Sequence, residues 1–242
     1  MRRAACLLTL LISALSAAPA SAQSCGAPGA PCTVDLGSYN ITLPTKSMEG
    51  PIPVVLHFHG YGGTGAGVVR NKGMMRPILD RGYAVIAPNG LVREGRNARS
   101  WSFIPNRPKQ RDELAFTRQV LSDAVSRFNL DRARVLLTGF SIGGSLTWYL
   151  ACQAPNDFAA YAPVAGGFWR PHPTRCAGPI KMLHTHGWRD STVPLEGRPI
   201  WGGVIHQGDI FQGLQLWRAE NGCNAGRPDR FITKGPFWRR TW

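Results

Sequence analysis

The amino-acid sequence predicts an α/β protein with a mostly parallel central sheet and helices on both faces. Two observations carry this prediction. The early strand candidates are nearly continuous apolar runs, as in strands buried on both faces, and they lie at 54–59, 83–88 and 134–138. Segments with helical spacing of apolar residues alternate with them, at about 66–80, 112–128 and 145–154. Strands that alternate with helices are typical of parallel sheets with crossover connections.

The first 22 residues have the features of a secretory signal. Two arginines follow Met1, an apolar run covers 7–15, and Ala-Ser-Ala precedes the expected cleavage site before Gln23. The apolar run is too short to span a bilayer, and no later segment is long enough. We therefore expect residues 1–22 to be removed and residues 23–242 to form one exported domain, extracellular or periplasmic. The oligomeric state is left open.

The cysteines are compatible with export, because disulfides persist in oxidising compartments. One of the six cysteines lies in the signal, which leaves five. Cys25 and Cys32 are candidates to close a small loop, and Cys152 with Cys176 to join a helix to a later loop. Sequence alone does not fix this connectivity. On this pairing Cys223 has no partner.

The chain is strongly basic, with a formal net charge of +14. Such a balance is compatible with nucleic acid or an anionic surface as partner. Here the arginines are scattered singly, without a basic helix face or an aromatic-basic RNA motif. We expect a solvated basic surface and no nucleic-acid partner, and leave adhesion to an acidic polymer open.

The other elements follow from local patterns. The composition of residues 23–37, rich in Cys, Pro and Gly, predicts a fixed N-terminal loop. Apolar and polar residues alternate at 39–43, which predicts a strand. Residues 89–110 predict a long loop, which in a compact domain is often functional. Later in the chain we expect strands at 158–164 and 180–185, a loop at 201–208, a helix at 210–221 and a strand at 231–242.

A candidate nucleophile lies where the strand at 134–138 meets the helix at 145–154. The run Gly139-Phe140-Ser141-Ile142-Gly143 matches Gly-x-Ser-x-Gly in a strand–turn–helix context, which exposes a serine on a sharp turn. Glycines are needed there because the turn brings backbone against backbone. We predict that Ser141 is the nucleophile. The alternative is a glycine-rich turn with an incidental serine.

A second turn, His59-Gly60-Tyr61-Gly62-Gly63, follows the strand at 54–59 and predicts an oxyanion hole. The expected donors are the backbone N–H groups of Tyr61 and Ile142. The alternatives are a plain glycine-rich turn or a phosphate loop, and no Gly-Lys-Ser/Thr follows to favour phosphate. We expect His59 to hold this turn rather than to act as a base.

A serine nucleophile needs a base and an acid that orients the base. The strand at 180–185 leads into a loop in which Asp190 has the place expected for this acid. The alternative is that Asp190 is a turn residue or a helix cap. Glu196 is the fallback acid.

Three motifs together resemble a known family. They are His-Gly-Tyr-Gly-Gly, Gly-Phe-Ser-Ile-Gly-Gly and His-Gly-Trp-Arg-Asp-Ser-Thr-Val-Pro, and in this order they resemble the polyhydroxybutyrate depolymerase/feruloyl esterase group of α/β-hydrolases. The resemblance implies an α/β-hydrolase fold and a secreted serine esterase. It implies as substrates polyesters of 3-hydroxy acids, or feruloyl and acetyl esters of plant polysaccharides. It implies no cofactor, and we expect no metal.

The base is the missing member of the set. Of six histidines only His206 follows Asp190, just before the helix at 210–221. In the family the base lies on a loop after the last core strand, and here the chain ends where that strand should begin. We therefore expect the C-terminal strand and helix of the fold to be lacking and the base to lie beyond Trp242. The unpaired Cys223 supports this expectation, because its partner would lie in the same missing segment. The weaker alternative is that His206 is the base.

The leading functional hypothesis is a secreted serine esterase that hydrolyses a polyhydroxyalkanoate, or its oligomers, through an acyl intermediate on Ser141. One alternative is a feruloyl or acetyl-xylan carbohydrate esterase. Another, of a different class, is a binding protein with this fold and weak or no activity. Four aromatic residues on predicted loops are candidates for an acyl pocket or for core packing: Trp101, Phe103, Trp169 and Trp188.

Overall fold

The computed structural model describes residues 25–27, 29–46, 49–93, 95–223 and 226–242. The predicted secretory signal at 1–22 lies outside this described part. Within the described residues, no helix is both long and apolar enough to cross a membrane.

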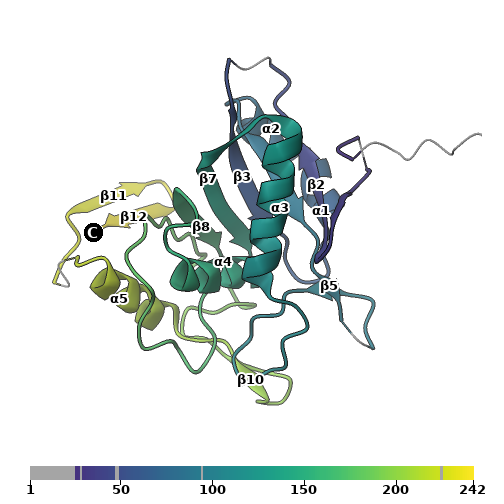
Figure 1. Ribbon diagram of the computed structural model, residues 1–242. Coiled ribbons are helices and arrows are strands. Elements are labelled where there is room, and N and C mark those ends of the chain that lie inside the picture. The colour runs from purple at the N-terminus through teal and green to yellow at the C-terminus, as the bar shows by residue number, and fades with distance from the viewer. Residues whose placement is uncertain (1–24, 28, 47–48, 94, 224–225) are drawn as a thin grey trace, which may run out of the picture.

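A six-stranded sheet forms the centre of the molecule (Figure 1). In spatial order its strands are β1 (Cys32–Val34), β2 (Gly37–Thr42), β4 (Ala84–Pro88), β3 (Ile52–Phe58), β7 (Leu130–Phe140) and β8 (Ala160–Val164). β1, β2 and β4 pair antiparallel, whereas β4, β3, β7 and β8 run parallel to one another. β3 and β4 are buried almost throughout, as their continuous apolar sequences predict.

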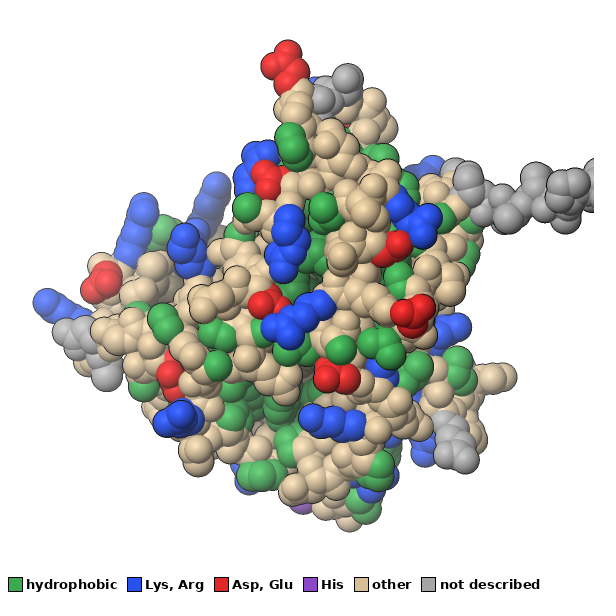
Figure 2. Space-filling model, viewed as in Figure 1, with side chains coloured by type: hydrophobic (Ala, Val, Ile, Leu, Met, Phe, Trp, Pro, Cys, Tyr) green, Lys and Arg blue, Asp and Glu red, His purple; other side chains and the backbone are tan. Residues whose placement is uncertain are grey.

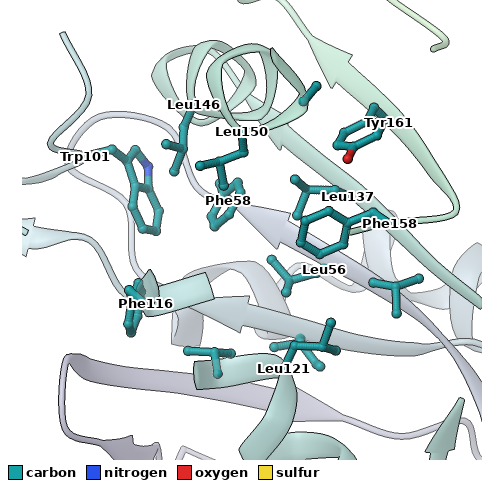
Figure 3. Packing of buried hydrophobic residues seen from close by; sticks show 14 of the residues in the cluster. Leu56, Phe58, Trp101, Phe116, Leu121, Leu137, Leu146, Leu150, Phe158 and Tyr161 are labelled. Carbon is teal, nitrogen blue, oxygen red and sulfur yellow. The ribbon is translucent and has the colours of Figure 1, made fainter. Parts of the chain in front are cut away.

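Helices cover both faces of the sheet, which confirms the predicted fold class. The helices are α1 (Gly65–Arg70), α2 (Lys72–Leu79), α3 (Glu113–Phe128), α4 (Ile142–Gln153) and α5 (Ile210–Glu220). Side chains alternate along β3, so Leu56 and Phe58 join the main core with α3 and α4 (Figure 3). Val55 points to the opposite face and packs with Met75 of α2 in a smaller cluster.

The helix predicted at 66–80 is two helices. Asn71 ends α1 and begins α2, and its side-chain oxygen accepts a hydrogen bond from the Met74 N–H at 3.2 Å. Asparagine favours such caps because its side chain competes for nearby backbone N–H groups. Apolar residues keep their helical spacing across Asn71, so this spacing did not predict the break between the two helices.

The segment predicted as a strand at 180–185 lies along the free edge of β8. The Tyr161 N–H donates to the Lys181 carbonyl, and the Leu183 N–H donates to the Tyr161 carbonyl, both at 2.9 Å. The segment forms isolated parallel bridges rather than a continuous ladder. It carries the chain along the sheet edge to the loop that contains Asp190.

Three short hairpins lie outside the central sheet. They are β5–β6 (Leu91–Val92, Arg99–Ser100), β9–β10 (Pro199–Ile200, Ile205–His206) and β11–β12 (Arg230–Lys234, Phe237–Thr241). The single strand predicted at 231–242 is wrong, because the chain reverses at Gly235, which has φ of 55°. Glycine adopts this left-handed conformation without steric cost. In Figure 1 this hairpin lies at the β8 end of the molecule, next to α5.

Both predicted disulfides form. Cys25 bonds Cys32, and Cys152 bonds Cys176 across 24 positions. The second bond ties the end of α4 to the loop before the edge segment. Cross-linking a loop of this length stabilises a fold by roughly 3 kcal/mol, mainly by restricting the unfolded chain. Cys223 forms no disulfide within the described residues.

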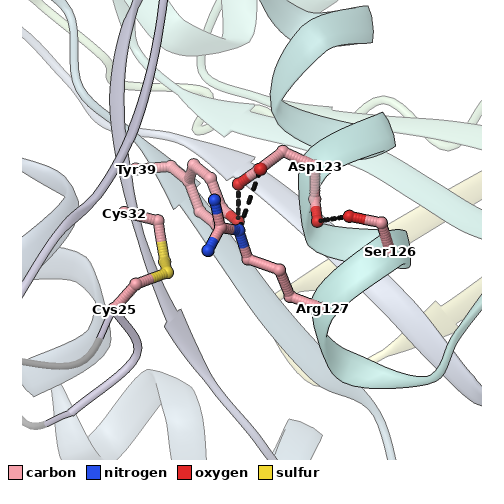
Figure 4. The surroundings of a disulfide bond; sticks show 6 residues. All are labelled: Cys25, Cys32, Tyr39, Asp123, Ser126 and Arg127. Atoms are coloured by element: carbon pink, nitrogen blue, oxygen red, sulfur yellow. Dashed lines mark hydrogen bonds and ion pairs between the residues drawn. A yellow bond between two sulfur atoms is a disulfide. The ribbon is translucent and has the colours of Figure 1, made fainter.

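The Cys25–Cys32 disulfide lies beside a contact between β2 and α3 (Figure 4). The Tyr39 hydroxyl donates to the Asp123 carboxylate at 2.8 Å, and Arg127 pairs with the same carboxylate at 2.8 Å. Burial, followed by the bond to Asp123, raises the pKa of Tyr39, so the phenol stays protonated and remains a donor. This contact fastens the antiparallel edge of the sheet to the helix that covers it.

Basic side chains are dispersed over the face shown in Figure 2, with acidic side chains among them. Some arginines pair with carboxylates at the surface, for example Arg118 with Asp157 at 2.6 Å. Exposed pairs of this kind are each worth about 0–1 kcal/mol. The dispersal agrees with the predicted solvated basic surface. The absence of a nucleic-acid partner stays a prediction.

Candidate active site

The Gly-x-Ser-x-Gly turn joins β7 to α4. Ser141 lies between them with φ of 56° and ψ of −120°, a conformation that non-glycine residues rarely adopt. Such residues cost about 1–3 kcal/mol and are found mostly at functional sites. A Cβ at Gly139 would lie 2.3 Å from the Gly143 carbonyl oxygen, and one at Gly143 would lie 2.3 Å from the Phe58 carbonyl oxygen. The close approach of three backbone segments therefore requires both glycines.

The predicted oxyanion turn lies directly against this serine. A Cβ at Gly60 would lie 3.6 Å from the Ser141 Cβ. The turn is closed by a bond from the Gly63 N–H to the Gly60 carbonyl at 3.0 Å. Within the described residues, the N–H groups of Tyr61 and Ile142 have no hydrogen-bond acceptor. Ile142 begins α4, where backbone donors lack intrahelical partners and the helix dipole favours negative charge.

His59 holds this turn in place, as predicted. The backbone N–H of Gly90 donates to its Nε2 at 3.0 Å, so the ring proton is on Nδ1, which donates to the Gly60 carbonyl at 2.7 Å. The ring is buried, and burial lowers its pKa. The Trp101 Nε1–H donates to the His59 carbonyl at 2.9 Å. His59 is thus a neutral structural residue with both nitrogens occupied.

The loop after the sheet edge places Asp190 in a tight turn. One carboxylate oxygen, Oδ1, accepts the N–H groups of Thr192 and Val193, each at 2.9 Å. The other, Oδ2, lies 3.7 Å from His186 Nε2. Asp190 therefore makes the turn bonds of the alternative interpretation and keeps Oδ2 available to orient a further group. Glu196, the fallback acid, is exposed.

Two histidines that sequence reasoning left unassigned support this loop. His186 Nε2 donates to the Val193 carbonyl at 2.7 Å, and His186 Nδ1 lies 3.1 Å from His184 Nε2. A proton therefore lies on His186 Nε2, because a carbonyl oxygen only accepts. Burial, then the neighbouring His186, lowers the pKa of His184 to about 3. His184 also packs edge-on against Trp148, with ring centroids 5.2 Å apart, so this pair anchors the Asp190 loop to the core.

None of the six histidines forms a hydrogen bond to Ser141. His206 lies in β10, where its carbonyl accepts the Arg170 N–H at 2.9 Å, and it makes no ion pair with Asp190. The structure therefore does not bring the weaker candidate base to the nucleophile. The Gly139–Gly143 turn, which we call the elbow, lies against the predicted oxyanion turn, and no base contacts Ser141 within the described residues.

The four aromatic candidates have different environments. Trp101 and Phe103 are mostly buried and line a cavity of about 340 Å³. Trp169 is core, with its backbone N–H bonded to the Tyr149 hydroxyl. Trp188 is 61% exposed and contacts the ring of Trp238, with centroids 5.4 Å apart. Trp101 and Phe103 thus line a cavity, and its use as an acyl pocket stays a prediction.

A buried ion pair fixes the loop that carries Trp101. Arg111 pairs with Glu113 at 2.8 Å, and a second Glu113 oxygen accepts the Ser102 N–H at 2.8 Å. Burial raises the pKa of Glu113, and Arg111 opposes that shift. The Arg111 guanidinium also lies 3.6 Å over the centroid of the Phe116 ring. Loss of either charged partner would leave an uncompensated buried charge, which is strongly destabilising.

Comparison with known proteins places this geometry in context. The dienelactone hydrolase family matches residues 40–198. Feruloyl esterase B of Piromyces equi is 26% identical over 188 residues, which cover 73% of this chain and 33% of that protein. A provisionally named feruloyl esterase C of Aspergillus niger is 25% identical over 212 residues, covering 84% of this chain and 68% of the relative.

Among solved structures, the carboxylesterase of Bacillus cereus superposes with a TM-score of 0.54 at 16% sequence identity. The alignment covers 76% of this chain and 81% of that protein. At this identity the likeness concerns the fold. The chain spans a third of the length of the Piromyces esterase and about two thirds of the Aspergillus protein.

Proposed function

Because the chain belongs to the dienelactone hydrolase family, we propose that it is a serine esterase that cleaves carboxylic esters through an acyl intermediate on Ser141. One observation carries the proposal. Ser141 stands in a strained conformation between β7 and α4, with the oxyanion turn against its Cβ. A plain connecting turn has no need of that strain.

The reaction follows from the positions of these groups. The Ser141 Oγ attacks the ester carbonyl carbon, and its proton passes to a general base. The negative charge that develops on the carbonyl oxygen is stabilised by the N–H groups of Tyr61 and Ile142. The alcohol leaves with a proton from the base, and an acyl ester remains on Ser141. Water, deprotonated by the same base, then releases the acid and restores the serine.

Asp190 has the role of orienting that base. Its Oδ1 is bound by two backbone N–H groups, which fixes the carboxylate and leaves Oδ2 as the acceptor. His186 is near Oδ2, but its Nε2 proton is donated to the Val193 carbonyl. His186 is therefore better suited to positioning the loop than to removing the Ser141 proton.

Chemical rescue tests whether Ser141 lacks a general base in this chain. Imidazole added at pH 7.5 is expected to accelerate hydrolysis of p-nitrophenyl butyrate by roughly tenfold or more, because a small base can take the Ser141 proton. The Ser141→Ala variant measures the direct reaction of imidazole with the ester, which is subtracted. A rate that imidazole leaves unchanged, together with fast hydrolysis in its absence, would show that a base is already in place.

Two substrate classes remain, and each has an observation in its favour. The three motifs resemble the polyhydroxybutyrate depolymerase/feruloyl esterase group, which is compatible with a polyhydroxyalkanoate or its oligomers. The Piromyces and Aspergillus relatives carry the name feruloyl esterase, which favours feruloyl esters of a polysaccharide. A third possibility, a binding protein with this fold, follows from the lack of a histidine bonded to Ser141. Export is part of the proposal, since two disulfides suit an oxidising compartment.

Product analysis distinguishes these classes. The purified chain is incubated with polyhydroxybutyrate and with feruloylated arabinoxylan, and 3-hydroxybutyrate and ferulate are quantified. Release of one acid that Ser141→Ala abolishes identifies the substrate class. Release of neither acid, combined with retention of the chain on one polymer in a pull-down, would support the binding protein and contradict the esterase.

A further inference from the structure

The loop at 89–102, between β4 and α3, holds the histidine of the oxyanion turn from two sides. The Gly90 N–H donates to His59 Nε2 at 3.0 Å, and the Trp101 Nε1–H donates to the His59 carbonyl at 2.9 Å. The rings of Trp101 and His59 also lie against each other, with centroids 4.7 Å apart. Both the ring and the backbone of His59 therefore take their places from this loop.

A third bond joins the loop to the far side of the turn. The Gly62 N–H donates to the Arg99 carbonyl at 2.9 Å, and Arg99 Nη1 in turn donates to the Gly90 carbonyl at 2.8 Å. A Cβ at Gly90 would lie 2.6 Å from the Ser100 carbonyl oxygen and 3.1 Å from His59 Cε1. The loop and the turn are thus in close backbone contact, and a shift of one would displace the other.

The buried ion pair of Arg111 and Glu113 binds both ends of this loop. Arg111 Nη2 donates to Glu113 Oε2 at 2.8 Å, and the two side chains are 4% and 3% exposed. At the start of the loop, the Arg111 guanidinium donates to the Asn89 carbonyl at 3.3 and 3.4 Å. At its end, Glu113 Oε1 accepts the Ser102 N–H at 2.8 Å. One charged pair therefore sets where the loop begins and where it ends.

The pair itself is fixed by the elements around it. Glu113 is the first residue of α3, directly after Asp112, whose carboxylate caps the helix. Arg111 Nη1 donates to the Leu36 carbonyl at 3.1 Å, and the guanidinium lies 3.6 Å over the centroid of the Phe116 ring. Apolar side chains often replace a buried ion pair without loss of stability, but they cannot bond the backbone groups of a loop. The directed bonds are what the charges supply here.

We propose that Arg111 and Glu113 are positioning residues of the esterase, which set the place of the oxyanion turn through the 89–102 loop. The proposal rests on the proposed esterase function. Oxyanion donors stabilise the transition state only when they are aimed at the place where its charge develops. A misplacement of about 1 Å that arises far from the reacting atoms can cost about 100-fold in rate. Both residues act on the turn through His59, which receives the bonds of the loop.

Glu113→Gln tests this role by kinetics, because it keeps the size of the side chain and removes the charge. Rates are compared for p-nitrophenyl butyrate and its thiono analogue, in which sulfur replaces the carbonyl oxygen. Imidazole is present as base, and the rate with the Ser141→Ala chain is subtracted. Sulfur accepts hydrogen bonds weakly, so a correctly placed oxyanion turn favours the oxygen ester.

The variant is expected to lower kcat for the oxygen ester by about tenfold or more, with KM within about twofold of the parent. The ratio of the oxygen-ester rate to the thiono-ester rate should fall by about fivefold or more, because the oxyanion bonds are the part that is lost. A merely structural role would not change this ratio, since a smaller folded fraction lowers both rates equally.

The Trp101 indole N–H reports the position of the turn without catalysis. Its resonance in a ¹⁵N–¹H correlation spectrum is identified by its disappearance in Trp101→Phe. Glu113→Gln is expected to raise the exchange of this proton with solvent by about tenfold or more, because the bond to the His59 carbonyl opens more often. A parent chain without Ser141-dependent hydrolysis would refute the esterase, and the exchange rate would still decide whether the pair holds the turn.

Asp157→Asn is the matched change from carboxylate to amide. Asp157 pairs with Arg118 of α3 at 2.6 Å, like Glu113 in an ion pair of that helix. It precedes the start of β8, whereas the Ser141 N–H bonds the Val164 carbonyl at the end of that strand. This control should keep the parental rate ratio and the parental exchange rate.

Arg111→Met combined with Glu113→Leu provides a second variant should Glu113→Gln fail to fold by circular dichroism. Removal of both charges together avoids an unpaired buried charge, so this chain is expected to fold. It should show the same fall in the rate ratio and the same rise in Trp101 exchange, because the bonds to the loop are lost. A folded variant that keeps either the parental rate ratio or the parental exchange rate would overturn the proposal.

Discussion

Ser141→Ala is expected to lower kcat/KM for p-nitrophenyl butyrate by on the order of 10³-fold or more, and to abolish any burst of p-nitrophenol. The acyl intermediate needs the Oγ, and the oxyanion donors alone retain only a small part of the rate enhancement. The measurement is stopped-flow release of p-nitrophenol, with imidazole present so that a base is supplied. The loss should appear in kcat rather than in KM, since the hydroxyl acts in the reaction and contributes little to substrate binding.

Ser126→Ala is the matched serine control. Ser126 lies on α3, where its hydroxyl bonds the Asp123 carbonyl at 2.7 Å, and it is exposed. Its removal should leave the kinetics unchanged. Circular dichroism should show that both variants keep the fold. A Ser141→Ala chain that retains the parental rate would refute Ser141 as the nucleophile and, with it, the proposed mechanism.

Gly143→Ala is expected to destabilise the fold by about 3 kcal/mol or more, or to prevent folding. The new Cβ would lie 2.3 Å from the Phe58 carbonyl oxygen and 2.6 Å from that of His59. Both atoms belong to the backbone of β3 and the oxyanion turn, so neither can move without breaking strand contacts. Overpacking against rigid backbone commonly costs 1–3 kcal/mol and at times more. Urea unfolding followed by circular dichroism measures the change.

Gly73→Ala is the control for this substitution. Gly73 lies near the start of α2, and its Cβ would meet only the Asn71 side-chain oxygen at 3.6 Å, an ordinary contact. Alanine in a helix is about 0.5–1 kcal/mol more favourable than glycine, so this variant should be at least as stable as the parent. Equal stability of the two variants would mean that the elbow is not as closely packed as the structure has it.

Family membership agrees with the α/β-hydrolase esterase grouping that three short motifs predicted. Each of those motifs is local in sequence, and the first two gather glycines at turns where backbone segments meet. The elbow at Gly139–Gly143 and the role of His59 in holding the oxyanion turn were both predicted. The residues that a tight turn requires are neighbours in the sequence, so the sequence shows them directly.

The missed features depend on residues far apart in the chain. His184 was assigned only to a strand and His186 only to the third motif, and the bond from His186 to the Val193 carbonyl depends on how the following loop folds back. Arg93 and Arg107 line one cavity, and Arg107 and Arg170 line another. Scattered arginines of this kind predict only a basic surface, because charge spacing along a loop does not indicate where the loop goes.

By itself, the sequence determined the order of the main strands and helices, the glycine turns and the candidate nucleophile, because these depend on local spacing and backbone sterics. Only the tertiary structure decided that 231–242 is a hairpin, that Asp190 Oδ1 is held in its turn, and that Arg93 and Arg107 line one cavity. These depend on long-range packing, in which the partners of each group come from distant segments. The same packing leaves His206 without a bond to Ser141.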